Sequence, residues 1–190
     1  MIRIAIFASG SGTNAEALIT HFQRIENVTV ARVLSNKDKA GVLFRSVRLG
    51  VPTHTFTKLE LEDESFLTLL QNDKIDFIVL AGFLLKIPSY LIKAFPEKII
   101  NIHPALLPKY GGKGMYGHHV HEAVIKNKEK ESGITIHLVD EIYDNGRHLY
   151  QARVPVDLSD NPDSLAEKIH HLEHRHFPEI VEKFVLGKLT

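Results

Sequence analysis

The sequence predicts an α/β fold with an open, mostly parallel sheet and helices on both faces. Three observations predict it. Short apolar or β-branched runs alternate with helical patterns through residues 1–103, which is the order of strands and helices in a parallel sheet. A glycine-rich turn at 10–12 joins the first such run to a helical pattern. The run 77–81 is almost continuously apolar, as a strand buried on both faces should be.

Five strands should lie in this first part of the chain. The first alternates large and small apolar residues, and the second is rich in β-branched residues. The expected strands are Ile2–Ala8, Val28–Val33, Val51–Phe56, Phe77–Ala81 and Ile99–His103. The helices between them have recognisable ends, because Thr13 and Glu16 have capping-box spacing and Gly50 closes the second helix. The expected helices are the segment from Thr13 through Phe22, then Leu43–Leu49, Glu62–Gln71 and Ser89–Ala94.

The pattern changes after residue 103. Glycines and prolines in 104–117 exclude long regular structure, and a helix is expected at His119–Lys128. Strands at Ile134–Val139 and His148–Val156 flank a turn signal at 144–146, which predicts a β-hairpin added to the sheet. Asn161 and Pro162 then have the chemistry of a helix start, so a long terminal helix is expected to about Leu186. The whole pattern is Rossmann-like.

Composition limits the possible functions. The 190 residues correspond to one domain, with 23 Lys+Arg against 23 Asp+Glu. A formal charge of zero does not indicate a nucleic-acid partner or binding to an anionic membrane. The absence of cysteine excludes disulfides, a thiolate nucleophile and a cysteine zinc site. No apolar run is long enough to cross a bilayer, and the first residues lack a signal-peptide layout, so a cytoplasmic location is expected.

The turn between the first strand and the first helix is a candidate phosphate site. Backbone N–H groups of Gly12, Thr13 and Asn14 should meet there at a helix N-terminus. No Gly-Lys-Ser/Thr sequence ends the turn, and no acid follows the second strand to hold a ribose. A single phosphate therefore fits better than the pyrophosphate of a nicotinamide cofactor. The alternative is a turn that only lets the helix pack on the strand.

A second candidate lies at the end of the last parallel strand. Asn101 and His103 are two residues apart, so their side chains face one side, at the edge where ligands bind in open α/β sheets. An amide beside an imidazole can stabilise an oxyanion, although a polar strand end that caps the following loop is an equal alternative. Asp144 is a weaker candidate on spacing alone, because aspartate is common in tight turns.

Histidine is unusually frequent, with twelve in the chain. Some of these histidines form two clusters: His118, His119 and His121 in or beside the glycine-rich segment, and His170, His171, His174 and His176 on the last helix. His170 and His174 have metal-ligand spacing, but no His-Glu-x-x-His motif occurs, so a solvated face is favoured for both clusters and no metal is expected. Glu173 lies four residues from apolar positions on either side, at the edge of the buried face. It could meet an ammonium group there, or form a surface ion pair with Arg175 or Lys183.

The sequence resembles the folate-dependent glycinamide ribonucleotide transformylases over essentially all 190 residues, and the resemblance rests on four motifs. The motifs are Ser9–Asn14, Leu80–Phe83, Asn101–Tyr110, and Gly133–Val139 leading to Asp144–Gly146. The resemblance implies transfer of a formyl group from 10-formyltetrahydrofolate to the amine of 5-phosphoribosylglycinamide, a step of de novo purine biosynthesis. It implies these two small molecules as partners, no metal, and a monomer or homodimer.

The resemblance also implies roles for particular residues. The catalytic group would be Asn101, His103 and Asp144, in a half formed by 101–190 that also binds folate. Residues 1–100 would form the phosphate-binding half, with Gly12, Thr13 and Asn14 as the phosphate loop. Glu173 would face the substrate amine, and Lys58 would replace an arginine that some members use for the phosphate. The pterin pocket would consist of Leu84, Leu85, Ile87, Val139, Asp140 and Glu141.

The expected mechanism is oxyanion stabilisation. Asn101 would donate to the formyl oxygen, and His103 would add a charged donor because Asp144 raises its pKa. Asp144 would take the amine proton, through water. The alternatives are a formyltetrahydrofolate hydrolase, which would carry a further N-terminal domain, and a tRNA formyltransferase, which would carry a C-terminal domain and a basic face. A non-catalytic folate or nucleotide sensor and a nicotinamide-dependent oxidoreductase remain as rivals of other classes.

Overall fold

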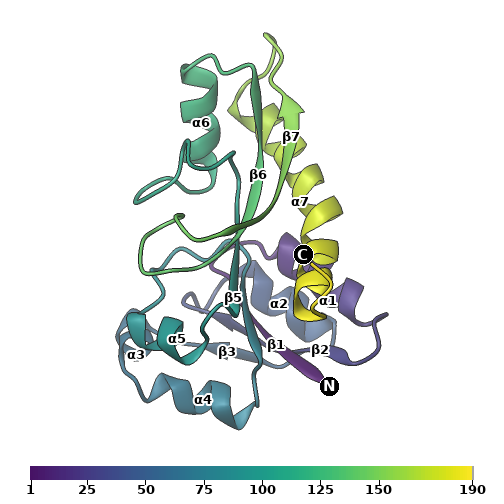
Figure 1. Ribbon diagram of the computed structural model, residues 1–190, viewed down its shortest axis with the longest axis vertical. Helices are drawn as coiled ribbons and strands as arrows, with labels where there is room; N and C mark the ends of the chain where they lie inside the picture. The colour runs from purple at the N-terminus through teal and green to yellow at the C-terminus, as the bar shows by residue number, and fades with distance from the viewer. Residues whose placement is uncertain (190) are drawn as a thin grey trace.

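The computed structural model describes residues 1–189. Its centre is a seven-stranded sheet in the order β3-β2-β1-β4-β5-β6-β7 (Figure 1). Strands β1 to β5 pair in parallel, and the β6–β7 hairpin extends the sheet with antiparallel pairing to β5. The strands are β1 (Ile2–Phe7), β2 (Val28–Ser35), β3 (Thr53–Thr55), β4 (Phe77–Leu80), β5 (Ile99–His103), β6 (Glu131–Leu138) and β7 (His148–Pro155). The predicted fold class is confirmed.

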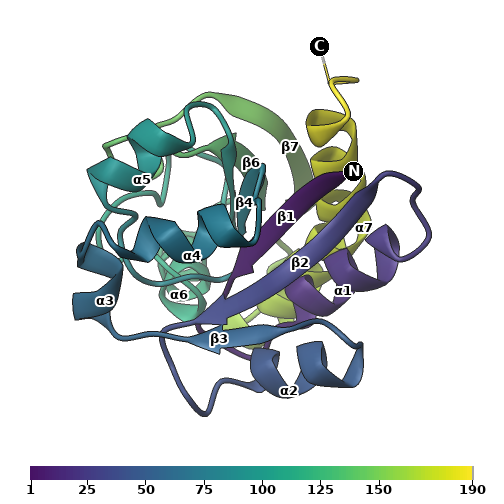
Figure 2. The ribbon, with the colours of Figure 1, turned by 90° about the horizontal axis from the view of Figure 1, so that it is seen from below.

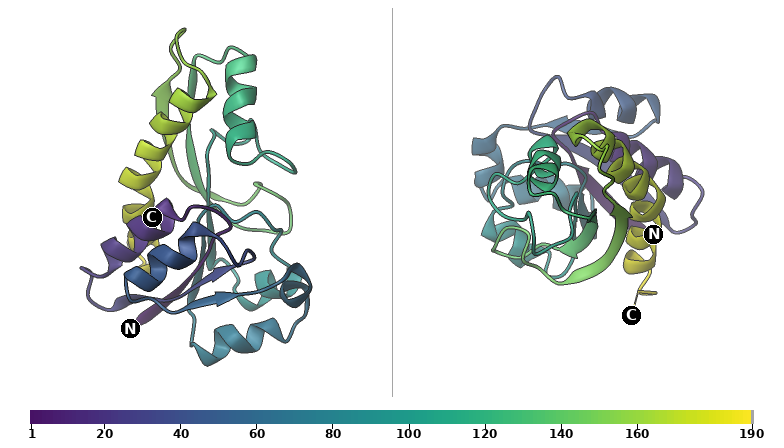
Figure 3. Two further views of the ribbon diagram at one scale, coloured as in Figure 1. Left: turned by 180° about the vertical axis from the view of Figure 1, so that it is seen from behind. Right: turned by 90° about the horizontal axis from the view of Figure 1, so that it is seen from above.

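Helices cover both faces of the sheet (Figure 2). The helices are α1 (Thr13–Phe22), α2 (Gly41–Arg48), α3 (Lys58–Glu62), α4 (Phe66–Asn72), α5 (Ser89–Ala94), α6 (His118–Lys126) and α7 (Pro162–Val185). Alternation along β1 explains the two cores, since Ile4 and Ile6 pack in the core with α1 and α7, whereas Phe7 packs in the core with α4 and α5. From behind, α7 runs along the hairpin and against α1 (Figure 3).

The helix expected at 62–71 begins later, at Phe66, and a separate short helix, α3, precedes it. Thr57 and Glu60 make a complete capping box that starts α3 at Lys58. Asp63 then adopts an extended conformation, which ends α3 after one turn, and α4 starts at Phe66. A capping signal upstream of the apolar pattern therefore decided where the helix begins.

The expected capping box of α1 is wrong. Its N-cap is Gly12, which has a φ of 83° and makes no side-chain cap bond. The Glu16 carboxylate instead pairs with Arg45 and Arg48 of α2. The start of α7 follows the prediction, because the Asn161 side chain accepts hydrogen bonds from the first-turn N–H groups next to Pro162.

At the hairpin tip the two strands end within one residue of the expected bounds, but the connection between them is not the tight turn that the signal at 144–146 predicts. Strand β6 ends at Leu138 and β7 begins at His148, so residues 139–147 form a loop rather than a tight turn. Gly146 is required there because a Cβ would lie 1.9 Å from the carbonyl oxygen of Leu138. The longer loop carries Asp144 back over the end of β5. Within residues 1–189 no helix is both long and apolar enough to cross a membrane.

Candidate active site

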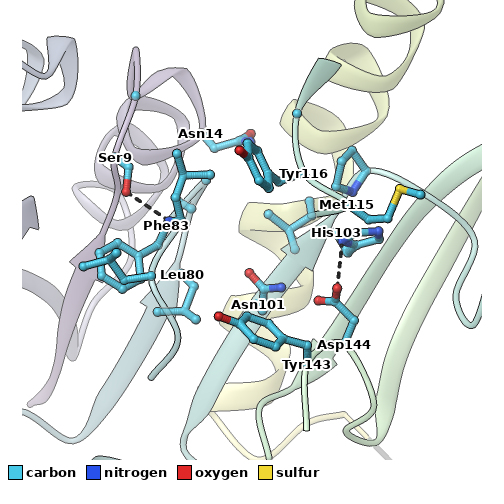
Figure 4. A pocket seen from close by; sticks show the side chains of 18 of the residues that line it. Ser9, Asn14, Leu80, Phe83, Asn101, His103, Met115, Tyr116, Tyr143 and Asp144 are labelled. Carbon is cyan, nitrogen blue, oxygen red and sulfur yellow. Dashed lines mark hydrogen bonds and ion pairs between the residues drawn. The ribbon is translucent and has the colours of Figure 1, made fainter. Parts of the chain in front are cut away.

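A cavity of about 730 Å³ opens at the carboxyl ends of β1, β4 and β5 (Figure 4). This is the edge of an open α/β sheet where ligands bind. Its wall includes the Gly10–Asn14 turn, the segment 80–87, the end of β5, the loop 112–117, the hairpin loop and two residues of α7. The cavity therefore brings together predicted site residues that are up to 161 positions apart, from Gly12 to Glu173.

The side chains of Asn101 and His103 both line this cavity, as their spacing in β5 predicts. The residues between and before them, Ile100 and Ile102, are buried in the core on the other face of the sheet. Asp144 reaches the same place from the hairpin loop. The three side chains named from the sequence thus surround one point (Figure 4).

His137 is a fourth member of this group, and no sequence motif indicates its role. It lies opposite Asn101 in the β5–β6 register and is buried. Its Nδ1 donates to the carbonyl oxygen of Leu138 at 2.7 Å, so Nε2 is free to accept from Asn101 Nδ2 at 3.1 Å. His137 therefore orients the Asn101 amide. Its place beside Asn101 follows only from the pairing register of β5 and β6, which the sequence does not reveal.

Asp144 lies between the two imidazoles. Its Oδ2 is 3.6 Å from His103 Nδ1, its Oδ1 is 3.6 Å from His137 Nε2, and Oδ2 accepts a 2.9 Å hydrogen bond from the N–H of Gly112. Burial opposes ionisation of this carboxyl, but the positive charge that His137 and His103 carry when they are protonated and the hydrogen bond from the Gly112 N–H outweigh burial, so the pKa of Asp144 lies below its ordinary value. Asp144 is therefore a carboxylate at neutral pH.

The expectation that His103 is an imidazolium is wrong for the unliganded site. Burial lowers the pKa of His103, and the nearby Asp144 carboxylate raises it by less, so the net shift is downward from 6.5. Nε2 of His103 donates to the carbonyl oxygen of Tyr110 at 2.7 Å. The ring is thus neutral at pH 7, with its proton on Nε2 and an unprotonated Nδ1 facing Asp144.

The glycine-rich turn has the form of an anion site. Gly12 adopts a left-handed conformation and lies so close to α2 that a Cβ would be 2.5 Å from the Cα of Val42. Since no side chain caps the start of α1, its first N–H groups are open to a ligand. Gly12, Thr13 and Asn14 all line the cavity.

Lys58 does not reach this site, which corrects the assignment made from the sequence. It lies on exposed α3, 3.5 Å from the Glu62 carboxylate, and is outside the cavity wall. Its side chain is 70% exposed to solvent. Lys37, two residues after the end of β2, lines the cavity beside the glycine turn instead.

Glu173 is buried in the cavity wall, with 6% of its surface exposed. Asn14 Nδ2 donates to Glu173 Oε2 at 2.8 Å, and burial raises the pKa of this carboxyl. The alternative of an ion pair with Arg175 or Lys183 is excluded among the residues described, since no cation lies within ion-pair distance of Glu173. The site therefore presents an acceptor for an amine or ammonium group.

His121 departs from the solvated face expected for the histidine clusters. It is 3% exposed, lines the cavity, and burial lowers its pKa to about 4. Its Nδ1 has no hydrogen-bond partner in the part of the chain that is described. His121 is thus a neutral ring in the wall, whereas His170, also in the wall, is exposed. No cluster of three potential metal ligands occurs between residues 1 and 189.

The other end of the cavity is apolar. Five of the six residues assigned to a pterin pocket line it, namely Leu84, Leu85, Ile87, Val139 and Asp140. Glu141 does not, because its carboxylate turns outward and accepts a hydrogen bond from the Ser89 hydroxyl. The adjacent Ile142 and Tyr143, not named from the sequence, lie in the wall instead.

Comparisons with known proteins agree with this geometry. A family model described as formyl transferase matches residues 2–181. A chloroplastic phosphoribosylglycinamide formyltransferase from Arabidopsis thaliana is 39% identical over 193 residues, covering 94% of this chain and 64% of the relative. The chain thus spans less than two thirds of that relative. The enzyme of the same name from Bacillus subtilis is 32% identical, over 97% of this chain and 95% of the relative.

Solved structures share the fold as well. The crystal structure of phosphoribosylglycinamide formyltransferase from Anaplasma phagocytophilum superposes with a TM-score of 0.89 at 34% identity, covering 98% of this chain and 88% of that chain. Glycinamide ribonucleotide transformylase 1 from Symbiobacterium toebii gives a TM-score of 0.89 at 32% identity, over 98% of this chain and 89% of that chain.

Proposed function

The chain belongs to the formyl transferase family, and on this premise we propose that it transfers the formyl group of 10-formyltetrahydrofolate to the amine of 5-phosphoribosylglycinamide, in purine biosynthesis. One observation carries the choice of acceptor. An anion-binding turn and a buried carboxylate without a cation share a cavity with Asn101, His103 and Asp144. A ribonucleotide with a phosphate at one end and an amine at the other matches these two features.

The proposal divides the cavity between two substrates. The phosphate binds the N–H groups at the start of α1, and the amine approaches Glu173 from the same side. The folate ring system lies in the apolar end, between segment 80–87 and the hairpin loop. This arrangement directs the amine towards a formyl carbon held beside Asn101, and positioning of this kind provides much of the rate gain.

The chemical step begins when the amine nitrogen attacks the formyl carbon. A C–N bond forms, the carbonyl electron pair moves to oxygen, and Asn101 donates an amide N–H to that oxyanion. The amine proton passes to His103 Nδ1, beside the Asp144 carboxylate, directly or through water. The resulting imidazolium is a second stabilising charge. The bond to folate N10 then breaks, N10 takes the electron pair and the proton, and formylated ribonucleotide and tetrahydrofolate leave.

A transfer assay tests the proposal against its rivals. The purified chain is mixed with 10-formyltetrahydrofolate, with and without 5-phosphoribosylglycinamide, and both tetrahydrofolate and the formylated ribonucleotide are measured. We expect equimolar products only when the ribonucleotide is present. Tetrahydrofolate and formate formed at the same rate without it would identify a hydrolase. Binding of both ligands without turnover would identify a sensor and overturn the proposal.

Replacing Glu173 by glutamine should weaken ribonucleotide binding about 10- to 100-fold and leave folate binding unchanged, because a buried charge-assisted contact to the amine is lost. Isothermal calorimetry with each ligand measures the two dissociation constants. Glu182→Gln is the matched control, since Glu182 lies on the same helix but pairs with His21 outside the cavity wall. Equal weakening of both ligands would contradict the assignment.

Replacing Lys37 by glutamine should raise the KM for the ribonucleotide about 2- to 5-fold, because an exposed cation beside the phosphate is lost. Lys58→Gln should leave this KM unchanged. Initial rates at saturating folate and varied ribonucleotide give the KM of each variant. The reverse ranking would restore Lys58 as the phosphate contact and reject Lys37.

The finer statements about partners and location remain part of the proposal. The two small molecules are the expected partners, without nucleic acid, and the protein acts as a monomer or homodimer. A cytoplasmic location stays a prediction, since the Arabidopsis relative is named chloroplastic.

A further inference from the structure

Helix α2 holds the carbonyl groups of the glycine-rich turn. The N–H of Val42 donates to the carbonyl oxygen of Gly10 at 3.2 Å, and Arg45 Nε donates to the carbonyl oxygen of Ser11 at 3.0 Å. Both carbonyls therefore point at α2. The turn and α2 approach each other closely at two glycines. A Cβ on Gly41 would lie 3.0 Å from the Ser11 oxygen, and one on Gly12 would collide with Val42.

The orientation of these carbonyls fixes the N–H groups of the turn. In a planar trans peptide the C=O and the following N–H point in opposite directions. When the Ser11 carbonyl is held towards α2, the N–H of Gly12 is directed away from α2, on the side where the turn lines the cavity. The Gly10 carbonyl bond directs the N–H of Ser11 in the same way. If these peptides rotated, carbonyl oxygens would face the phosphate and repel it.

Arg45 is itself held in place from α1. The Glu16 carboxylate pairs with Arg45 through one oxygen and with Arg48 through the other. Arg45 thus links α2, the turn and the helix whose N-terminus forms the anion site. Arg48 shares only the ion pair with Glu16, and its hydrogen bonds do not include the turn.

We propose that Arg45 is a positioning residue for phosphate binding: its bond to the Ser11 carbonyl holds the turn in the orientation that presents its N–H groups to the phosphate of the substrate. Arg45 contacts the turn from the side of α2, and its guanidinium is committed to Glu16 and Ser11. The inference rests on the proposed function only for the identity of the phosphorylated ligand.

The test compares Arg45→Met with Arg48→Met. Each variant removes one arginine from Glu16, but only the first removes the bond to the turn. Rates are measured with 5-phosphoribosylglycinamide and with the same ribosylglycinamide lacking its phosphate. We expect Arg45→Met to lower kcat/KM about 10-fold for the phosphorylated substrate, through KM, and to change the dephosphorylated substrate less than 2-fold. Arg48→Met should change neither by more than about 2-fold.

Arg45→Lys distinguishes the effect of the bond to the turn from the effect of the ion pair with Glu16. Lysine keeps a cation for Glu16 but has no Nε, so this variant should melt like the wild type and still lose phosphate affinity, measured with ribose 5-phosphate by calorimetry. Equal losses in Arg45→Met and Arg48→Met, or equal losses with both substrates, would overturn the inference. A wild-type chain that binds ribose 5-phosphate but does not formylate the ribonucleotide would instead overturn the proposed function and leave this inference standing.

Discussion

Replacing Asn101 by alanine should lower kcat for formyl transfer by about 10²–10³-fold, with the dissociation constants of both substrates changed little. One N–H of the Asn101 amide is already committed to His137 Nε2 at 3.1 Å, which leaves the rest of the amide for the cavity. The oxyanion forms only in the chemical step. A donor aimed at it therefore contributes to the transition state and hardly to substrate binding.

Single-turnover rates and calorimetry on the same variant provide the measurement. Asn101→Asp is the matched control for size, because it keeps the shape of the side chain and removes the donor; it should be at least as slow as Asn101→Ala. A variant with kcat within about 5-fold of wild type would remove the oxyanion role, since a lost donor in this position costs far more. Parallel losses in kcat and in folate affinity would instead assign Asn101 to binding.

His137 explains why this effect should be large. It is buried, and its tautomer is fixed by the bond from Nδ1 to the Leu138 carbonyl. Nε2 can then only accept, so the Asn101 amide must present its NH₂ to His137, and the amide plane is set before substrate arrives. A donor that is oriented in advance needs no reorganisation during the reaction, which is the source of its effect.

The parts of this site that follow from local rules were predictable from the sequence. Alternation in a strand places Asn101 and His103 on one side, and the end of a parallel strand places them at the ligand edge. A glycine turn between strand and helix predicts an anion site at Gly12 in the same way. Asp144 could be assigned only through family resemblance, because its return over β5 depends on the length of a loop.

The parts that depend on long-range packing were not predictable. His137 meets Asn101 through the β5–β6 register, and Lys58 lies in the exposed helix α3, which was not expected from the apolar pattern. The protonation state of His103 also depends on packing that the sequence does not show. The resemblance implies a carboxylate beside His103, but the burial that outweighs its effect on the pKa of His103 exists only in the folded chain.

Replacing Asp144 by asparagine should lower the plateau of kcat/KM by about 10²–10⁴-fold, because the imidazolium formed in the reaction loses the carboxylate that stabilises it. It should also move the acidic limb of the pH profile to lower pH. The sign follows from the pKa of His103, which burial lowers below 6.5 and which Asp144 partly restores. Without the carboxylate that pKa falls further, and a group that works unprotonated then stays active in more acidic solution.

Profiles of kcat/KM between about pH 5 and 9, with an NMR titration of the His103 ring, check both parts of this prediction. Asp63→Asn makes the same change at an exposed turn outside the cavity and should leave the limb in place. The wild-type profile, compared with the NMR titration of His103, separates two mechanisms. If neutral His103 accepts the amine proton, activity rises with pH through its pKa; if His103 must be charged at the outset, activity falls through the same pKa. A falling profile, or a limb that moves to higher pH in Asp144→Asn, would exclude His103 as the proton acceptor.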